Sequence, residues 1–343
     1  MQTMRAAFLV KNGPADAAFE VCETAMPQRK PNEYLIKVEA FGLNFADVMA
    51  RQGFYRDAPP LPAILGYDLV GRVVEAPDGH SDAIGKRVAA MSRFGGYAEY
   101  AVAIPGAVFF VSDGMDDAAA CALGTQYCTA WHAAFQATSM NSGDTVLIHA
   151  AAGGVGTALV QLALWKGCTV VAMAGSDAKI DELKKAGAQY TVNYRTENYA
   201  EAIPKLLGKR RPIDLSFNAV GGTTFKKDMK LLSPGGRLVL YGASERTGKK
   251  GGNLATYKML WQMGIVIPLL LVAGSRSVIG VNVLRIADHR PDLIKAAVAE
   301  LSKLWDGGVI RPKSGGVYPI ERLADAHRAL EQRQTTGKIA VKW

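Results

Sequence analysis

Residues 144–167 decide the fold, and they read DTVLIHAAAGGVGTALVQLALWKG. The run Thr145–His149 consists mostly of strand-forming residues, which is typical of a strand buried on both faces. Alanines and glycines follow, and then apolar residues recur with helical spacing as far as Gly167, a residue type that commonly ends helices. A strand, a glycine turn and a helix in this order predict a dinucleotide-binding motif.

The glycine turn suits a phosphate because the start of a helix leaves several backbone N–H groups unpaired and carries partial positive charge. Small side chains also let the backbone approach a pyrophosphate closely. We therefore predict a pyrophosphate site at Ala152, Gly153, Gly154, Val155 and Gly156. The alternative is a tight strand-to-helix connection that binds nothing.

Strands and helices alternate through the middle of the chain. We expect strands at 145–149, 169–174, 190–194, 213–218, 236–241 and 277–283, and helices at 155–166, 177–186, 198–207 and 223–232. Repeated β-α units with short connections predict an α/β fold with a Rossmann-type, doubly wound parallel sheet. Before about residue 125, strand-like runs are separated by glycine and proline, which predicts a strand-rich second domain.

Composition narrows the classes of protein. The 343 residues allow two domains, and the net charge of +9 favours anionic ligands. The basic groups Lys209–Arg211, Lys226–Lys227 and Lys249–Lys250 are interpreted as solvated surface, and no nucleic-acid partner is expected because no nucleic-acid-binding motif accompanies them. Four cysteines without a C-x-x-C pair, and an N-terminus without a signal peptide, predict a cytoplasmic location.

The most apolar run is Ile265–Ala273, which is too short to cross a bilayer and contains Pro268. We interpret it as a buried segment or an oligomer interface, with membrane contact as the alternative. No integral membrane segment is expected.

Several motifs together resemble the medium-chain dehydrogenase/reductase superfamily, quinone oxidoreductase type. They are the AAxGGVG turn, a GxNxxDxxxRxGxY pattern that begins at Gly42, Gly95–Tyr100 and Thr336–Lys338. Segment 259–274 and the chain end resemble the subgroup of vesicle amine transport protein homologues. The resemblance implies a GroES-like catalytic domain at 1–125, a dinucleotide-binding domain at 126–283, a return segment at 284–343 that completes the first domain, and a homodimer.

The end of the second predicted strand selects the cofactor. A carboxylate there would bind both ribose hydroxyls and repel a 2′-phosphate, but Ala174 occupies the position, which favours NADPH over NADH. Ser176 offers a hydroxyl, although it can equally be a plain helix N-cap. The resemblance implies that Lys179 and Tyr194 contact the 2′-phosphate, whereas Lys179 could also be a solvated helix residue. The charge of the neighbouring Asp177 opposes this interpretation.

The resemblance also places the rest of the cofactor. Gly242 and Ser244 would face the ribose, and Asn282 would lie beside the carboxamide. Zinc members of the superfamily carry a catalytic Cys, a GHE motif and a four-cysteine lobe. In this chain the Cys position falls near Asn44 and residues 66–68 read GYD, so no metal is predicted. We interpret His149 as a packed, hydrogen-bonded imidazole.

Hydride transfer needs hydrogen-bond donors for the negative charge that develops on the acceptor oxygen. Asn44 and Tyr55 are the candidate donors, with turn stabilisation and packing as their respective alternatives. The resemblance implies that Thr129 lies near the nicotinamide, although it could be an ordinary helix residue. Asp47 and Arg51, four residues apart, predict an ion pair within one helix.

These features predict a zinc-independent, NADPH-dependent oxidoreductase that transfers hydride to a quinone or an α,β-unsaturated carbonyl compound. A rival hypothesis is a nucleotide-binding protein of low activity that acts through association with a membrane or RNA.

Overall fold

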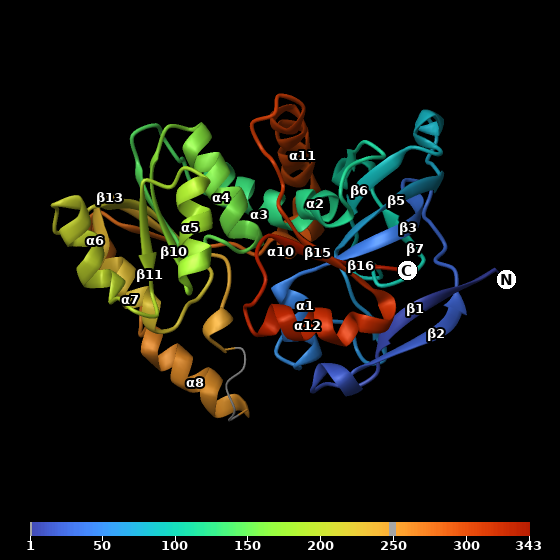
Figure 1. Ribbon diagram of the computed structural model, residues 1–343, viewed down its shortest axis with the longest axis horizontal. Coiled ribbons are helices and arrows are strands. Elements are labelled where there is room, and N and C mark those ends of the chain that lie inside the picture. Colours follow the sequence, from blue (N-terminus) through green and yellow to red (C-terminus); the bar gives the residue numbers. More distant parts are fainter. Residues whose placement is uncertain (1, 247–251) are drawn as a thin grey trace. The chain divides into compact units, whose positions relative to one another are not determined.

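The structure is a computed structural model that describes residues 2–246 and 252–343, and the chain divides into two compact units (Figure 1). Unit 1 comprises Met1–Cys128, Leu284–Asp306 and Pro312–Trp343, and unit 2 comprises Thr129–Val283 and Gly307–Arg311. The basic pair Lys249–Lys250 lies outside the described residues. Each unit is built around a β-sheet of its own.

In its described part, unit 2 contains a six-stranded parallel sheet with the strand order β11-β10-β9-β12-β13-β14. The strands are β9 (Thr145–Ile148), β10 (Thr169–Ala174), β11 (Tyr190–Asn193), β12 (Ile213–Asn218), β13 (Leu232–Leu240) and β14 (Ser277–Gly280). The helices between them are α4 (Gly154–Trp165), α5 (Asp177–Lys185), α6 (Tyr199–Leu207) and α7 (Thr223–Leu231). Figure 1 shows α4 and α5 on one side of β10 and β11, and α6 and α7 on the other. This is the predicted doubly wound arrangement.

Two predicted strand boundaries in unit 2 were wrong by three residues or more, and the others differ by at most one residue. Strand β13 begins at Leu232 rather than at residue 236, because Leu232 pairs with Ile213 across a register shift. Strand β14 ends at Gly280 rather than at residue 283, and the chain enters helix α10 (Val283–His289) shortly afterwards. The core of the unit joins apolar sheet residues such as Leu147 to Ile203 of α6 and Phe225 of α7.

Unit 1 is rich in strands. Its described part contains a seven-stranded sheet with the order β15-β16-β3-β5-β6-β8, in which β7 also pairs with β3, and a smaller sheet with the order β2-β1-β4. The strands are β1 (Thr3–Leu9), β2 (Phe19–Ala25), β3 (Tyr34–Leu43), β4 (Ala63–Ile64), β5 (Asp68–Glu75), β6 (Arg87–Met91), β7 (Tyr100–Ala103), β8 (Val108–Phe110), β15 (Ser314–Pro319) and β16 (Lys338–Lys342).

The end of the chain is built into this sheet, because β16 pairs antiparallel with the last residues of β3. The α-helices of unit 1 include α1 (Phe45–Arg51), α2 (Asp117–Ala122), α11 (Pro291–Asp306) and α12 (Leu323–Glu331). Helices α1 and α12 lie side by side (Figure 1). The first residues after β3 and the last strand of the chain are therefore neighbours.

The interpretation of Ile265–Ala273 as a buried segment was wrong. Helix α9 (Pro268–Gly274) contains no buried residue, and Ile265 just before it is 91% exposed. By length and composition alone, residues 257–274 could cross a membrane, with a mean hydropathy of 1.5. The backbone nevertheless breaks between helix α8 (Gly252–Met263) and α9, where Gly264 has a φ of 77°. The segment therefore forms two short helices rather than one long helix.

Candidate active site

The predicted pyrophosphate turn joins β9 to α4 in unit 2. A Cβ atom on Gly156 would lie only 2.2 Å from the carbonyl oxygen of Ala150, so only glycine fits there. Gly153 is the N-cap residue of α4 and has no side chain that could occupy the first N–H groups of the helix. The turn therefore combines close backbone packing with a helix N-terminus that no side chain caps, which fits a pyrophosphate.

The residues predicted to contact a 2′-phosphate gather at the end of β10. Gly175 packs so closely against Tyr194 that a Cβ atom would lie 2.5 Å from the tyrosine hydroxyl. Ser176 is the N-cap of α5, but its side chain makes no capping hydrogen bond, so the hydroxyl is not used as a cap. The nearby Asp177 carboxylate accepts a hydrogen bond of 2.8 Å from the Asn193 amide. Lys179 lies on the first turn of α5.

The loops that follow β12 and β13 also meet at this edge of the sheet. A Cβ atom on Gly242 would lie 2.7 Å from the carbonyl oxygen of Ala219, and the Ser244 N–H donates to the same oxygen at 3.1 Å. The Val281 N–H donates to the carbonyl of Leu240 at 2.8 Å, which keeps the chain in line with β13 as it approaches Asn282. The structure thus brings the predicted ribose and carboxamide residues to the carboxyl ends of parallel strands, where nucleotides bind in such sheets.

A buried hydrogen-bond network below these loops was not predicted. The Asp228 carboxylate on α7 accepts hydrogen bonds from His149 at 2.8 Å, Tyr199 at 2.7 Å, Ser216 at 2.9 Å and Asn218 at 2.7 Å. The interpretation of His149 as a packed, hydrogen-bonded imidazole is confirmed, because it is 1% exposed. Sequence spacing could not indicate the network, because its members come from four separate segments of the chain.

The loop after β12 depends on the same network. The side-chain oxygen of Asn218 accepts hydrogen bonds from the backbone N–H groups of Val220 at 2.8 Å and Gly221 at 2.9 Å, while its amide nitrogen donates to Asp228. The buried carboxylate of Asp228 therefore helps to hold a loop that borders the predicted nucleotide site.

In unit 1, Asn44 lies at the N-terminus of α1 and is 7% exposed. Its amide nitrogen donates to the Asp68 carboxylate at 2.7 Å, and its amide oxygen accepts a hydrogen bond of 2.9 Å from the ammonium group of Lys338. Asp68 and Lys338 also form an ion pair, and both side chains are fully buried. Neither residue was among the predicted site residues, although both belong to motifs that the sequence displays.

The predicted ion pair between Asp47 and Arg51 was wrong. The Asp47 carboxylate instead accepts the backbone N–H of Asn44 at 2.7 Å, and Arg51 pairs with Glu331 of α12 at 2.5 Å. A buried guanidinium requires a carboxylate at close range, and the packing of α12 against α1 supplies one. Burial raises the pKa of the Asp47 carboxyl to about 7, and the hydrogen bond from Asn44 opposes this effect.

Tyr55 and Thr129 lie in different units. Tyr55 follows α1 in unit 1, is half-buried and places its ring 6.5 Å from that of Tyr67 in an edge-on contact. Thr129 is 6% exposed and belongs to α3 (Cys128–Trp131), which is flanked by π-helical turns at Leu123–Tyr127 and His132–Gln136. Such π-helical turns are frequent at functional sites.

The Asp68–Lys338 pair argues against a metal at Asn44. A buried carboxylate is a possible zinc ligand, but the ammonium of Lys338 already provides the opposite charge in contact with Asp68. A zinc ion beside this pair would place two cations together in a buried environment. The donor set therefore does not fit a zinc site.

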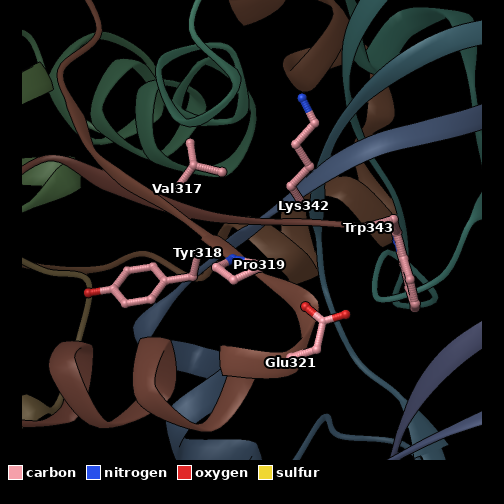
Figure 2. Close-up of a pocket in the computed structure, with 6 residues that line it drawn as sticks. All are labelled: Val317, Tyr318, Pro319, Glu321, Lys342 and Trp343. Atoms are coloured by element: carbon pink, nitrogen blue, oxygen red, sulfur yellow. The ribbon is translucent and has the colours of Figure 1, made fainter.

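A shallow hollow of about 360 Å³ lies elsewhere in unit 1. Figure 2 shows its lining residues: Val317, Tyr318, Pro319, Glu321, Lys342 and Trp343. Lys342 is near the Asp117 carboxylate at 3.6 Å, and the Trp343 indole donates to the carbonyl of Ala98 at 3.0 Å. The hollow contains none of the predicted site residues.

Known proteins share this organisation. The alcohol dehydrogenase GroES-like domain family matches residues 30–113, and the zinc-binding dehydrogenase family matches residues 154–300. The human synaptic vesicle membrane protein VAT-1 homolog is 34% identical over 319 residues, which cover 92% of this chain and 80% of the relative. The quinone oxidoreductase of Pongo abelii is 31% identical over 342 residues, which cover 98% and 97% of the two chains.

A solved structure of a mycobacterial protein in complex with NADPH has the same fold. It is 28% identical, with a TM-score of 0.83, and the match covers 99% of this chain and 100% of the other. The chain therefore belongs to the medium-chain dehydrogenase/reductase superfamily, in the quinone oxidoreductase branch that includes the VAT-1 homologues.

Proposed function

We propose that this NADPH-dependent oxidoreductase transfers hydride to a quinone or to an α,β-unsaturated carbonyl compound without the help of zinc. The observation that carries the proposal is the glycine turn, whose close backbone packing suits the binding of a dinucleotide pyrophosphate. Gly156 lies against Ala150 at a distance that leaves no room for a Cβ atom. The relatives named quinone oxidoreductase and the NADPH complex of the mycobacterial relative support the same function.

Unit 2 supplies the residues that would hold the cofactor. The turn Ala152–Gly156 would bind the pyrophosphate, and Ser176, Lys179 and Tyr194 would contact the 2′-phosphate. Gly242 and Ser244 would face the ribose, and Asn282 would lie beside the carboxamide. When bound, NADPH would supply the hydride.

Unit 1 supplies uncharged donors for the acceptor. Asn44 is held by Asp68 and Lys338, so its amide cannot rotate freely. One of its two N–H bonds is used by Asp68, and the other could stabilise the charge that develops on the acceptor oxygen. A quinone is a strong electrophile, so this chemistry does not require a Lewis acid.

Titration of tryptophan fluorescence with NADPH and NADH, followed by a panel of quinones and enones, tests the proposal. We expect tighter binding of NADPH and its oxidation by at least one acceptor. Asn44→Ala should lower kcat with the best acceptor while leaving the Kd for NADPH unchanged. Binding without turnover of any acceptor would contradict the proposal.

A second candidate function, association with an anionic membrane surface, is favoured by exposed apolar side chains on α8 and α9 and on the loop between them. Trp261, Ile265 and Val272 are 81%, 91% and 77% exposed. From residue 246 to residue 287 the sequence contains no Asp or Glu, and its charged residues are Arg246, Lys249, Lys250, Lys258, Arg276 and Arg285. A stretch of sequence that combines exposed apolar side chains with basic residues and no acidic ones is typical of a segment that lies in an anionic interface.

The helix lengths favour lying on the membrane over crossing it. At 1.5 Å per residue, α8 spans about 18 Å and α9 about 10 Å, less than the roughly 30 Å of a hydrocarbon core. A second copy of the chain is a less suitable partner for this surface, because it would bring equal basic charges together. The name of the VAT-1 relatives, which refers to a vesicle membrane, points the same way.

Flotation with vesicles of phosphatidylcholine alone, and with added phosphatidylserine, tests this candidate. We expect binding only to the anionic vesicles, lost at high salt and in the variant Trp261→Ser/Ile265→Ser. Ile84→Ser, which changes an exposed apolar residue elsewhere, serves as the control. Membrane association would be contradicted if Trp261→Ser/Ile265→Ser bound the anionic vesicles as well as Ile84→Ser does. It would also be contradicted if the wild-type protein formed a dimer that the variant Trp261→Ser/Ile265→Ser does not form.

A further inference from the structure

The hydroxyl group of Tyr67 is buried without a normal hydrogen bond. Tyr67 lies between β4 and β5 and is 5% exposed. Among the described residues, its hydroxyl oxygen has no partner at hydrogen-bond geometry. Buried polar groups are nearly always paired, so an unpaired hydroxyl requires an explanation. A ligand atom that completes the hydrogen bond is one such explanation.

The backbone around Tyr67 is held firmly in place. The Tyr67 carbonyl accepts the Ser92 N–H at 2.8 Å, and the Leu65 carbonyl accepts the Tyr97 N–H at 3.0 Å. The Gly66 carbonyl accepts the Ser92 hydroxyl at 3.3 Å. These bonds fix the backbone from Leu65 to Tyr67, so the backbone cannot easily shift to bring the hydroxyl to another partner within the protein.

The ring of Tyr67 is held as well. The ring of Phe94 lies 4.8 Å from it, and the guanidinium of Arg93 lies 4.7 Å from the Phe94 ring and pairs with Asp288 at 2.8 Å. Phe94 adopts a φ of 63°, a left-handed conformation that is rare for a bulky residue. Such strain persists where the surrounding structure fixes it, and it is concentrated at ligand sites.

The hydroxyl of Tyr55 interacts with that of Tyr67. The two phenol rings meet edge-on, and their hydroxyls influence each other without normal hydrogen-bond geometry. Burial raises the pKa of both phenols, and the charge of Asp47 raises them further, so both remain neutral donors. An oxygen atom placed near both hydroxyls could accept a hydrogen bond from each.

We propose that Tyr67 donates a hydrogen bond to the oxygen of the hydride acceptor and shares this oxygen with Tyr55. The inference rests on the proposed function, which it extends to a further residue of the acceptor site. Unlike Asn44, which already donates to Asp68, Tyr67 has no partner at normal hydrogen-bond geometry among the described residues, and its hydroxyl interacts only weakly with that of Tyr55.

The step is balanced without a new reagent. When bound, NADPH would supply the hydride to the acceptor and leave as NADP⁺, and the displaced electron pair would move onto the acceptor oxygen. Water then supplies the proton that completes the hydroquinone, or the saturated ketone when the acceptor is an enone. Tyr67 stabilises the oxygen while the charge develops and keeps its own proton.

Tyr67→Phe tests the inference, because it removes the hydroxyl and keeps the ring. We expect kcat/KM for the acceptor to fall on the order of 100-fold, as for the loss of one donor to a developing oxyanion. The Kd for NADPH should not change, and the melting temperature should stay equal or rise, since an unpaired buried hydroxyl has been removed. If the Tyr67 hydroxyl only faces a trapped water, kcat/KM of Tyr67→Phe should stay within twofold of wild type. That result would overturn the inference.

Tyr34→Phe is the matched control, because the Tyr34 hydroxyl has a partner in His80 at 3.0 Å. It should leave kcat/KM unchanged. Binding of hydroquinone to the NADP⁺ complex, followed by tryptophan fluorescence, gives a second measurement that needs no turnover. If none of the tested acceptors is reduced by wild type with NADPH, the proposed function fails. Weaker hydroquinone binding by Tyr67→Phe would still support the role of Tyr67, and equal binding would overturn it.

Discussion

Among the substitutions that we consider in unit 1, replacement of Lys338 should lower the free energy of unfolding most. Its ammonium is fully buried and contacts both Asp68 and Asn44. Lys338→Met would leave the Asp68 charge buried without a counter-ion, which typically costs about 3–5 kcal/mol. We expect a loss of this size in the free energy of unfolding by urea denaturation.

Lys342 on the same strand provides the control. Its side chain is 59% exposed and lies 3.6 Å from Asp117, so Lys342→Met should cost less than about 1 kcal/mol. Adding Asp68→Asn to Lys338→Met should restore part of the lost stability. If Lys338→Met is as stable as Lys342→Met, the pair does not carry the buried charge that we assign to it.

Asp47 should make stability depend on pH. Burial raises the pKa of its carboxyl from 3.8 to about 7, so between these pH values the folded state keeps a proton that the unfolded state has released. This contribution to stability therefore decreases as pH rises from about 4 to about 7 and is fully lost above that range. Asp47→Asn should be up to about 4 kcal/mol more stable than wild type at pH 8, with a smaller difference at pH 4.

Denaturant titrations across this pH range provide the measurement for Asp47. Asp292→Asn is a suitable control, because Arg290 lowers the pKa of that exposed carboxyl instead of raising it. A stability difference between Asp47→Asn and wild type that stays constant with pH would show that the carboxyl is ionised throughout.

At the scale of elements, the junction of β9 and α4 depends on Gly156. An alanine there would force the helix away from Ala150, because its Cβ atom would lie 2.2 Å from a backbone oxygen. Overpacking of this kind costs about 1–3 kcal/mol, so we expect NADPH affinity to fall by roughly 10- to 100-fold. Gly153→Ala, whose Cβ atom would lie 3.2 Å from the same oxygen, should have a smaller effect. Equal Kd values for the two variants, measured by fluorescence titration, would contradict this account.

The Asp228 network joins His149, which directly follows β9, to residues of β12, α6 and α7. Asp228→Ala would leave up to four buried donors unpaired, each at a cost of about 1–3 kcal/mol, so we expect a loss of several kcal/mol. Asp181→Ala on the exposed face of α5 is the control, since that carboxylate is 66% exposed. Urea denaturation of both variants compares them directly. A similar small effect in both would show that the network contributes little.

At the scale of the whole molecule, the proposal requires activity without a metal. Removal of metals with a chelator should leave turnover and the melting temperature unchanged, and metal analysis of the purified protein should find no stoichiometric zinc. Full loss of activity that zinc alone restores would overturn this part of the proposal.

The homodimer and the cytoplasmic location stay predictions, and light scattering would measure the oligomeric state.

The sequence by itself determined the α/β fold of unit 2 and the place of the glycine turn. Both follow from local rules, because strand and helix periodicity and the steric freedom of glycine depend on neighbouring residues. The motif residues Asn44, Asp68 and Lys338 were likewise visible in the sequence, and so was the absence of a carboxylate at Ala174.

Only the tertiary structure decided which charges meet. Lys338 is 294 residues from Asn44, and Arg51 is 280 residues from its partner Glu331, so spacing suggested the wrong partner for Arg51 and no partner for Lys338. The exposure of α9 was equally hidden, because hydrophobicity shows what a segment could bury but not whether another element covers it. Contacts of this kind arise from packing between elements, which no local pattern specifies.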